Sequence, residues 1–136
     1  MNWLILCIIT IVTSGIVGFF IKLAFRYSSW TEIYVVEMAT LFVLSLLVFV
    51  IQRPTISVGS LGFYYALIAG VMATVGSVAI YLALQEGNAM VVIPLTSIYP
   101  VVTIVLSYFI LHEHISPVKW AGVVLALVAL VLIALD

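Results

Sequence analysis

The chain consists almost entirely of long apolar segments, with its few charged residues between them. A helix needs about 20 mostly apolar residues, at about 1.5 Å each, to cross the hydrocarbon core of a bilayer. Five segments predict transmembrane helices: Trp3–Phe25, Thr31–Ile51, Leu61–Leu84, Ala89–Leu111 and Pro117–Leu135. The apolar runs are continuous and do not alternate with polar residues, so they exclude a transmembrane β-barrel.

The composition excludes a soluble domain and indicates that lipid is the main solvent. Of the 136 residues, 67% are hydrophobic and 7% are charged, whereas a soluble domain carries roughly 25% charged residues. The net charge of −1 gives no basic surface for nucleic acid, which is bound through many phosphate contacts. We therefore expect one all-α integral membrane domain over residues 1–136, multi-pass in the cell (inner) membrane, with the lipid bilayer and not nucleic acid as a partner.

Polar residues recur at helical spacing inside the apolar segments. In the third segment, Gly70, Thr74, Ser77, Tyr81 and Gln85 follow one another at steps of four, three, four and four. Such a stripe lies on one helix face, and polar side chains in lipid usually face a bundle interior or a wet cavity. The alternative is close helix packing, with hydroxyls bonding between helices. We interpret the stripe as part of a polar interior in which Tyr81 and Gln85 line a solute pathway.

The fourth segment contains two prolines, Pro94 and Pro100. Each proline lacks an N–H and clashes with the carbonyl four residues back, which opens the helical hydrogen-bond ladder. A broken helix near the bilayer midplane is a pointer to the binding site of a transporter, although a single proline can also be a tolerated kink. The neighbouring hydroxyls favour the site, so we expect the prolines to shape it and Ser97, Tyr99 and Thr103 to line it.

Glu37 is a carboxylate about two turns into the second segment, surrounded by apolar residues. Intramembrane carboxylates are rare and often belong to ion or substrate pathways, so Glu37 suits proton coupling or binding of a cationic substrate. The alternative is an interfacial carboxylate paired with Lys22 or Arg26, which lie at a helix end on the same side of the membrane. Beyond coupling to a proton or another cation, we expect no cofactor.

The sequence offers no catalytic or metal-binding motif. His112 and His114 flank Glu113 after the fourth segment, but their i, i+2 spacing points them to different helix faces, unlike the shared face of an HExxH motif. No P-loop, GxSxG or GxGxxG pattern is present. We therefore expect neither a metal site nor an enzyme.

The distribution of cations does not choose an orientation in the membrane. With five spans, Arg53 and Lys119 fall on one side and Lys22 and Arg26 on the other, two on each, so the positive-inside bias is zero. Two copies of a five-helix unit fused head to tail would have opposite orientations, and inverted repeats around a midplane site underlie many alternating-access transporters. We therefore expect a homodimer with opposed subunits, or a pair with a homologous partner subunit.

The chain also resembles one EamA-type repeat of the drug/metabolite transporter superfamily over nearly its whole length. The residues that carry the resemblance are Gly15 and Lys22 in GIVGFFIK, Pro94, Pro100 and Glu113 in AMVVIPLTSIYPVVTIVLSYFILHEHIS, and Ser116, Lys119 and Gly122 in SPVKWAG. Where family members often carry Arg in the second helix, this chain has Glu37, so a basic substrate contact does not carry over.

The resemblance implies one half of an inverted-repeat transporter that moves a small metabolite or drug-like solute by alternating access. In that fold we assign Lys22 and Glu113 to helix-end geometry and not to the solute pathway. Two alternatives stay open: a membrane assembly or scaffold subunit that does not transport, and a flippase for lipid-linked headgroups.

Overall fold

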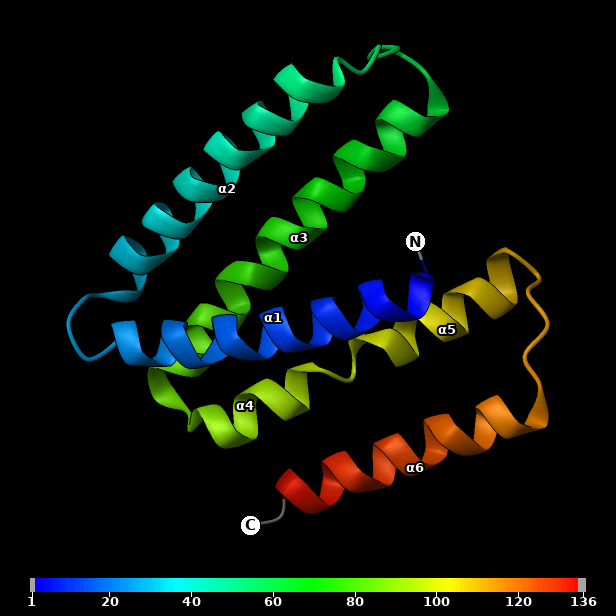
Figure 1. Cartoon of the computed structure of the whole chain (residues 1–136). Coiled ribbons are helices and arrows are strands. Elements are labelled where there is room, and N and C mark those ends of the chain that lie inside the picture. Colours follow the sequence, from blue (N-terminus) through cyan, green and yellow to red (C-terminus); the bar gives the residue numbers. More distant parts are fainter. Residues whose placement is uncertain (1, 135–136) are drawn as a thin grey trace. The chain divides into compact units, whose positions relative to one another are not determined.

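The computed structural model describes residues 2–134 and contains six α-helices within them (Figure 1). The helices fall into two compact units that divide between Glu86 and Gly87. The predicted all-α class is therefore confirmed, but the fourth predicted helix is broken in two. The predicted end of the last helix at Leu135 lies outside the described residues.

Four helical stretches of the described chain are long and apolar enough to cross a membrane: Trp3–Ala24, Trp30–Gln52, Leu61–Glu86 and Ala89–Ile110. The last helix has a shorter apolar stretch, Pro117–Ile133. Its 17 residues correspond to about 25 Å, the lower end of the length of transmembrane helices.

The first unit contains α1 (Trp3–Ala24), α2 (Trp30–Gln52) and α3 (Leu61–Glu86). The start of α2 is fixed by a capping box: the Ser29 N–H donates to the Glu32 carboxylate at 3.1 Å, and the Glu32 N–H donates to the Ser29 hydroxyl at 3.5 Å. The chain then turns back through Gly59, whose φ of +90° is easily reached only by glycine. As a result α2 and α3 form an antiparallel hairpin (Figure 1).

The three helices of this unit meet at one end, where α1 finishes, α2 begins and α3 finishes (Figure 1). The small core at this end contains Tyr81, which is 2% exposed, and Leu84, which is 0% exposed. Gly18 of α1 is also buried. Away from this end, the described side chains of α1 before residue 18 and of α2 after residue 38 are exposed.

The second unit contains α4 (Ala89–Thr96), α5 (Tyr99–Ile110) and α6 (Pro117–Ala134). The helices α4 and α6 are in contact, and the rings of Tyr108 and Trp120 meet edge to face, with centroids 6.3 Å apart, to join α5 to the start of α6. The side chain of Asn88 accepts a hydrogen bond from the Met90 N–H at 3.1 Å and caps α4.

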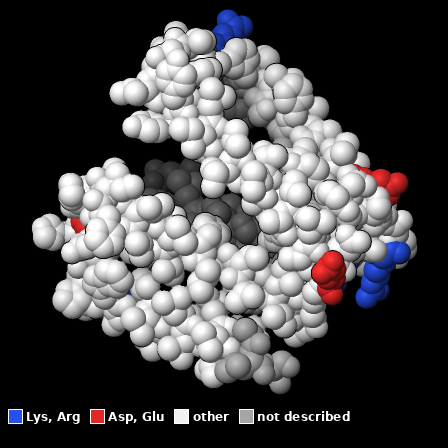
Figure 2. Space-filling view, turned by 180° about the vertical axis from the view of Figure 1, so that it is seen from behind, with Lys and Arg blue, Asp and Glu red and all other residues white. Residues whose placement is uncertain are grey.

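Most large apolar side chains of both units are exposed. The space-filling view of one face shows charged side chains only in a few separate places (Figure 2). Large exposed apolar surfaces mark contact with a membrane or a protein partner. This exposure is what a chain whose solvent is lipid requires.

Candidate functional site

The meeting point of the first unit is organised around Tyr81. Its ring packs edge to face against Tyr34 of α2, with centroids 5.5 Å apart, and at a tilt against Phe25, with centroids 6.2 Å apart. Such aromatic pairs stabilise beyond the area that they bury. Tyr81 of α3 therefore packs against Tyr34 of α2 and against Phe25, which directly follows α1.

A second contact ties α1 to α3. The Lys22 ammonium donates a hydrogen bond of 2.7 Å to the main-chain oxygen of Leu84 and lies 5.9 Å from the centre of the Phe25 ring. The Leu84 carbonyl belongs to the last turn of α3, where no N–H of the same helix is available. A lysine at this place satisfies the carbonyl and complements the negative end of the helix dipole.

Beside this meeting point lies a groove of about 440 Å³ between α1 and α2, with Tyr81 of α3 at its base, which we call the α1–α2 groove. Its wall is mostly aliphatic and aromatic, and its lining residues are Ile16, Val17, Phe20, Ile21, Ala24, Ser28, Glu32, Ile33, Val36, Glu37 and Tyr81. Volumes of this size are typical of small-molecule sites.

Two polar atoms of the α1–α2 groove are buried without a hydrogen-bond partner among the described residues: Oε2 of Glu37 and the hydroxyl of Tyr81. The Glu37 side chain as a whole is half-buried, whereas Tyr81 is almost fully buried. Within the described chain, Glu37 forms no ion pair with Lys22 or Arg26. Buried polar groups in folded proteins are nearly always paired, so each exception calls for an explanation.

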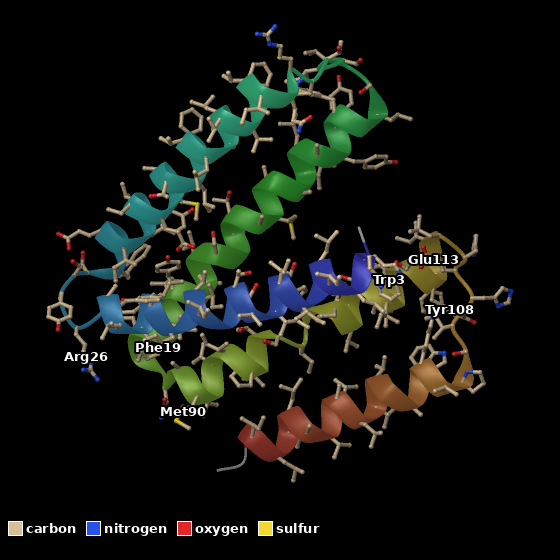
Figure 3. All side chains as sticks on the ribbon, viewed as in Figure 1. Trp3, Phe19, Arg26, Met90, Tyr108 and Glu113 are labelled. Carbon is tan, nitrogen blue, oxygen red and sulfur yellow. The ribbon has the colours of Figure 1, made fainter. Side chains whose placement is uncertain are left out.

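Gln85 does not join Glu37 and Tyr81. It lines a separate pocket of about 400 Å³ at the end of the unit, together with Lys22, Phe25, Arg26, Ser28, Ser29 and Trp30. Arg26 is exposed at this end of α1 (Figure 3). The predicted pathway along α3 is therefore divided between an apolar groove that contains Tyr81 and a basic pocket that contains Gln85.

In the second unit the break between α4 and α5 falls at Ser97 and Ile98. Pro94 lies inside α4, and Pro100 lies in the first turn of α5, where a missing N–H costs least. The Ser97 hydroxyl donates to the Ile93 carbonyl at 2.8 Å, and the Thr96 hydroxyl donates to the Val92 carbonyl at 2.9 Å. Hydroxyls of this kind bond to backbone carbonyls where prolines interrupt a transmembrane helix.

A groove of about 360 Å³ follows this break within the second unit, and its lining residues are Ser97, Ile98, Pro100, Val101, Ile104, Lys119, Gly122, Val123, Ala126 and Leu130. Of the residues predicted on the fourth segment, Ser97 and Pro100 therefore share one groove. Pro94, Tyr99 and Thr103 do not line it. Tyr99 is 70% exposed.

Glu113 lies beyond the end of α5, near Tyr108 (Figure 3). The backbone N–H of Glu113 donates to the Ser107 carbonyl at 3.3 Å, after His112 reverses the chain with a φ of 54°. The described part of the chain has no group of three His, Cys, Asp or Glu residues that could hold a metal ion.

Sequence reasoning missed the wall of the α1–α2 groove. Its α1 side consists of residues 16, 17, 20, 21 and 24, which share one helix face because they recur at steps of one and three. The pattern is visible in the sequence, but nearly every residue of α1 is apolar. An apolar lining on a helix that is apolar all round cannot be recognised from the sequence.

Similarity to known proteins extends over nearly the whole chain. The family model described as the EamA-like transporter family matches residues 1–135. An uncharacterized protein from Methanocaldococcus jannaschii is 29% identical over 133 residues, which cover 98% of this chain and 96% of that protein. No solved structure matches the chain.

Proposed function

The chain belongs to the EamA-like transporter family and is a multi-pass integral membrane protein, and we propose that it carries a small metabolite or drug-like solute across the cell (inner) membrane by alternating access. The observation that carries this proposal is the α1–α2 groove. It combines a mostly apolar wall with two unpartnered polar atoms, on Glu37 and Tyr81. Small-molecule sites have this character: an apolar cavity with a few placed polar groups.

The acting unit in this proposal is an antiparallel homodimer. The first unit has one small core and exposes most of its apolar side chains, so one chain leaves much helix surface for a partner or for lipid. An odd number of spans gives two opposed copies the symmetry of an inverted repeat, which alternating access uses. The balance of two cations on each side of the membrane is consistent with insertion in both directions.

Glu37 is the residue we propose for coupling. A carboxylate oxygen without a partner inside a membrane-spanning helix can take up a proton or a cation in exchange for solute. We assign Pro94 and Pro100 to the conformational change of the transport cycle, since a broken helix lets α4 and α5 change their mutual angle at Ser97 and Ile98. Tyr99 and Thr103, exposed in one chain, are proposed to face the pathway only in the dimer.

The first experiment measures the orientation of the chain. The C-terminus is fused separately to a reporter that is active only in the cytoplasm and to one that is active only outside. Activity of both fusions is expected, because the cation bias is zero. Activity of only one contradicts the homodimer and requires a partner chain of opposite orientation.

A second experiment asks whether water reaches the proposed site. In a Cys7→Ser background, single cysteines replace Val36 in the α1–α2 groove and Val43 on the exposed face further along α2. A membrane-impermeant thiol reagent is expected to label position 36 faster than position 43. Equal, slow labelling at both positions would favour a packed scaffold subunit and not a transporter.

A further inference from the structure

The two unpartnered atoms of the α1–α2 groove specify the chemistry of a ligand. Oε2 of Glu37 is a carboxylate oxygen and accepts hydrogen bonds, and the hydroxyl of Tyr81 can both accept and donate one. Neither has a partner among the described residues, and both side chains line the same groove. A ligand that donates two hydrogen bonds from one positive group can satisfy both atoms.

Tyr81 is fixed in this position. It is 2% exposed, and the rings of Phe25 and Tyr34 pack against it. Because the hydroxyl is buried without a partner among the described residues and Tyr81 lines the groove, a group that enters the groove can supply the missing hydrogen bond. Leaving such a group unpaired costs free energy, so an entering donor gains affinity.

The charge of the entering group follows from Glu37. Glu37 forms no ion pair within the described chain, and the groove contains no Lys or Arg side chain. The second carboxylate in the lining, Glu32, already binds the Ser29 N–H in the capping box of α2. The unmatched charge of the groove is therefore negative, and its complement is a cation.

The other lining residues of the α1–α2 groove determine the size and polarity of the rest of the ligand. Apart from Ser28 and the residues just discussed, the lining is aliphatic or aromatic, with Val17, Phe20 and Val36 among its members. A volume of about 440 Å³ accommodates a small apolar body but not a large macrocycle. The described lining offers no positive charge to the anionic group of a zwitterion or a phosphate ester.

Resting on the transport function proposed above, we propose that the solute is an amphipathic amine that carries N–H bonds on its ammonium group. The ammonium donates one hydrogen bond to Oε2 of Glu37 and one to the hydroxyl of Tyr81, and the apolar body lies against α1 and α2. A quaternary ammonium has the same charge but no N–H, so it can satisfy neither atom by hydrogen bonding. The groove therefore distinguishes amines by their donors and not by charge alone.

The test uses three probes with the same body: benzylammonium, benzyltrimethylammonium and benzyl alcohol. Binding to the full chain in lipid nanodiscs is measured by calorimetry, with empty nanodiscs subtracted for partition into lipid. Benzylammonium is expected to bind at least about tenfold more tightly than either analogue, since charge-assisted hydrogen bonds are the strong ones. Glu37→Gln should remove this preference, and Tyr81→Phe should weaken binding of benzylammonium roughly fivefold.

Two matched variants control for the loss of a carboxylate charge and of a tyrosine hydroxyl as such. Glu86→Gln and Tyr65→Phe make the same chemical changes at exposed positions outside the groove and should leave all three affinities unchanged. Equal binding of the three probes, or unchanged binding in both groove variants, overturns the assignment, because the probes would then bind through their shared apolar body and not through Glu37 and Tyr81.

Uptake of radiolabelled benzylammonium into proteoliposomes separates this inference from the function on which it rests. Selective binding together with uptake that Glu37→Gln abolishes supports both. Selective binding without uptake overturns the transport function and leaves the amine site. Uptake of benzyltrimethylammonium at the same rate as benzylammonium overturns the N–H requirement and leaves the transport function.

Discussion

The ammonium of Lys22 donates a 2.7 Å hydrogen bond to the main-chain oxygen of Leu84, and so joins the last turn of α1 to the last turn of α3. The Leu84 side chain is 0% exposed. The contact lies at the point where all three helices of the first unit meet, and the donor that satisfies this carbonyl near the end of α3 comes from α1.

Replacing Lys22 by Met should lower the free energy of unfolding by about 1–3 kcal/mol, because a main-chain acceptor loses its charged donor. The measurement is equilibrium unfolding in detergent micelles, followed by circular dichroism. Lys119→Met, at an exposed position of α6, is the matched control and should change little. Equal loss in both variants would mean that charge, and not the contact with Leu84, sets the stability.

The capping box at the start of α2 gives a second prediction. Ser29→Ala removes the oxygen that accepts from the Glu32 N–H and should destabilise the protein by about 0.5–2 kcal/mol. The same unfolding assay measures it, with Ser28→Ala as the control, since no side-chain hydrogen bond of Ser28 takes part in the cap. A neutral Ser29→Ala would show that the lipid interface, and not the cap, fixes the start of α2.

Tyr81 allows its ring and its hydroxyl to be separated. Tyr81→Phe should keep or slightly raise the stability of the ligand-free protein, because it removes a buried hydroxyl that has no partner. Tyr81→Ala should cost about 3–5 kcal/mol, as for other large aromatic residues in a core. If Tyr81→Phe were instead strongly destabilising, the hydroxyl would have a structural partner, and the amine site would lose its second acceptor.

Pro100→Ala tests the origin of the break between α4 and α5. An alanine N–H at position 100 can donate to the carbonyl of Thr96, which favours a continuous helix. Spin labels at Met90 and Phe109, both exposed, should then report a longer distance, approaching about 28 Å for the 19 helical steps between these positions. Pro54→Ala, in the turn after α2, is the control and should leave this distance unchanged.

The sequence predicted the helices well because their boundaries depend on local signals. Trp3, Leu61, Ala89 and Pro117 begin helices as predicted, since polar or turn-forming residues precede each apolar run. The third helix extends to Glu86, beyond the predicted end at Leu84. The prolines predicted a defect in the fourth helix, but they did not predict that the break falls at Ser97 and Ile98.

The candidate site was only partly predictable, because it depends on contacts between helices. Tyr81 and Gln85 share a face of α3 and are about 6 Å apart along the helix axis, yet Tyr81 lines the apolar groove and Gln85 lines the basic pocket. The neighbours of Tyr81, Phe25 and Tyr34, come from distant parts of the sequence. Intrahelical spacing contains no information about them.

The first unit is packed at one end only. Buried contacts gather around Tyr81, Leu84 and Gly18, while the far ends of α1 and α2 are tied by no buried side chain in the described residues. The first unit is therefore packed at the end that contains Tyr81 and Leu84, and α1 and α2 expose their apolar side chains to lipid or to a partner along the rest of their length.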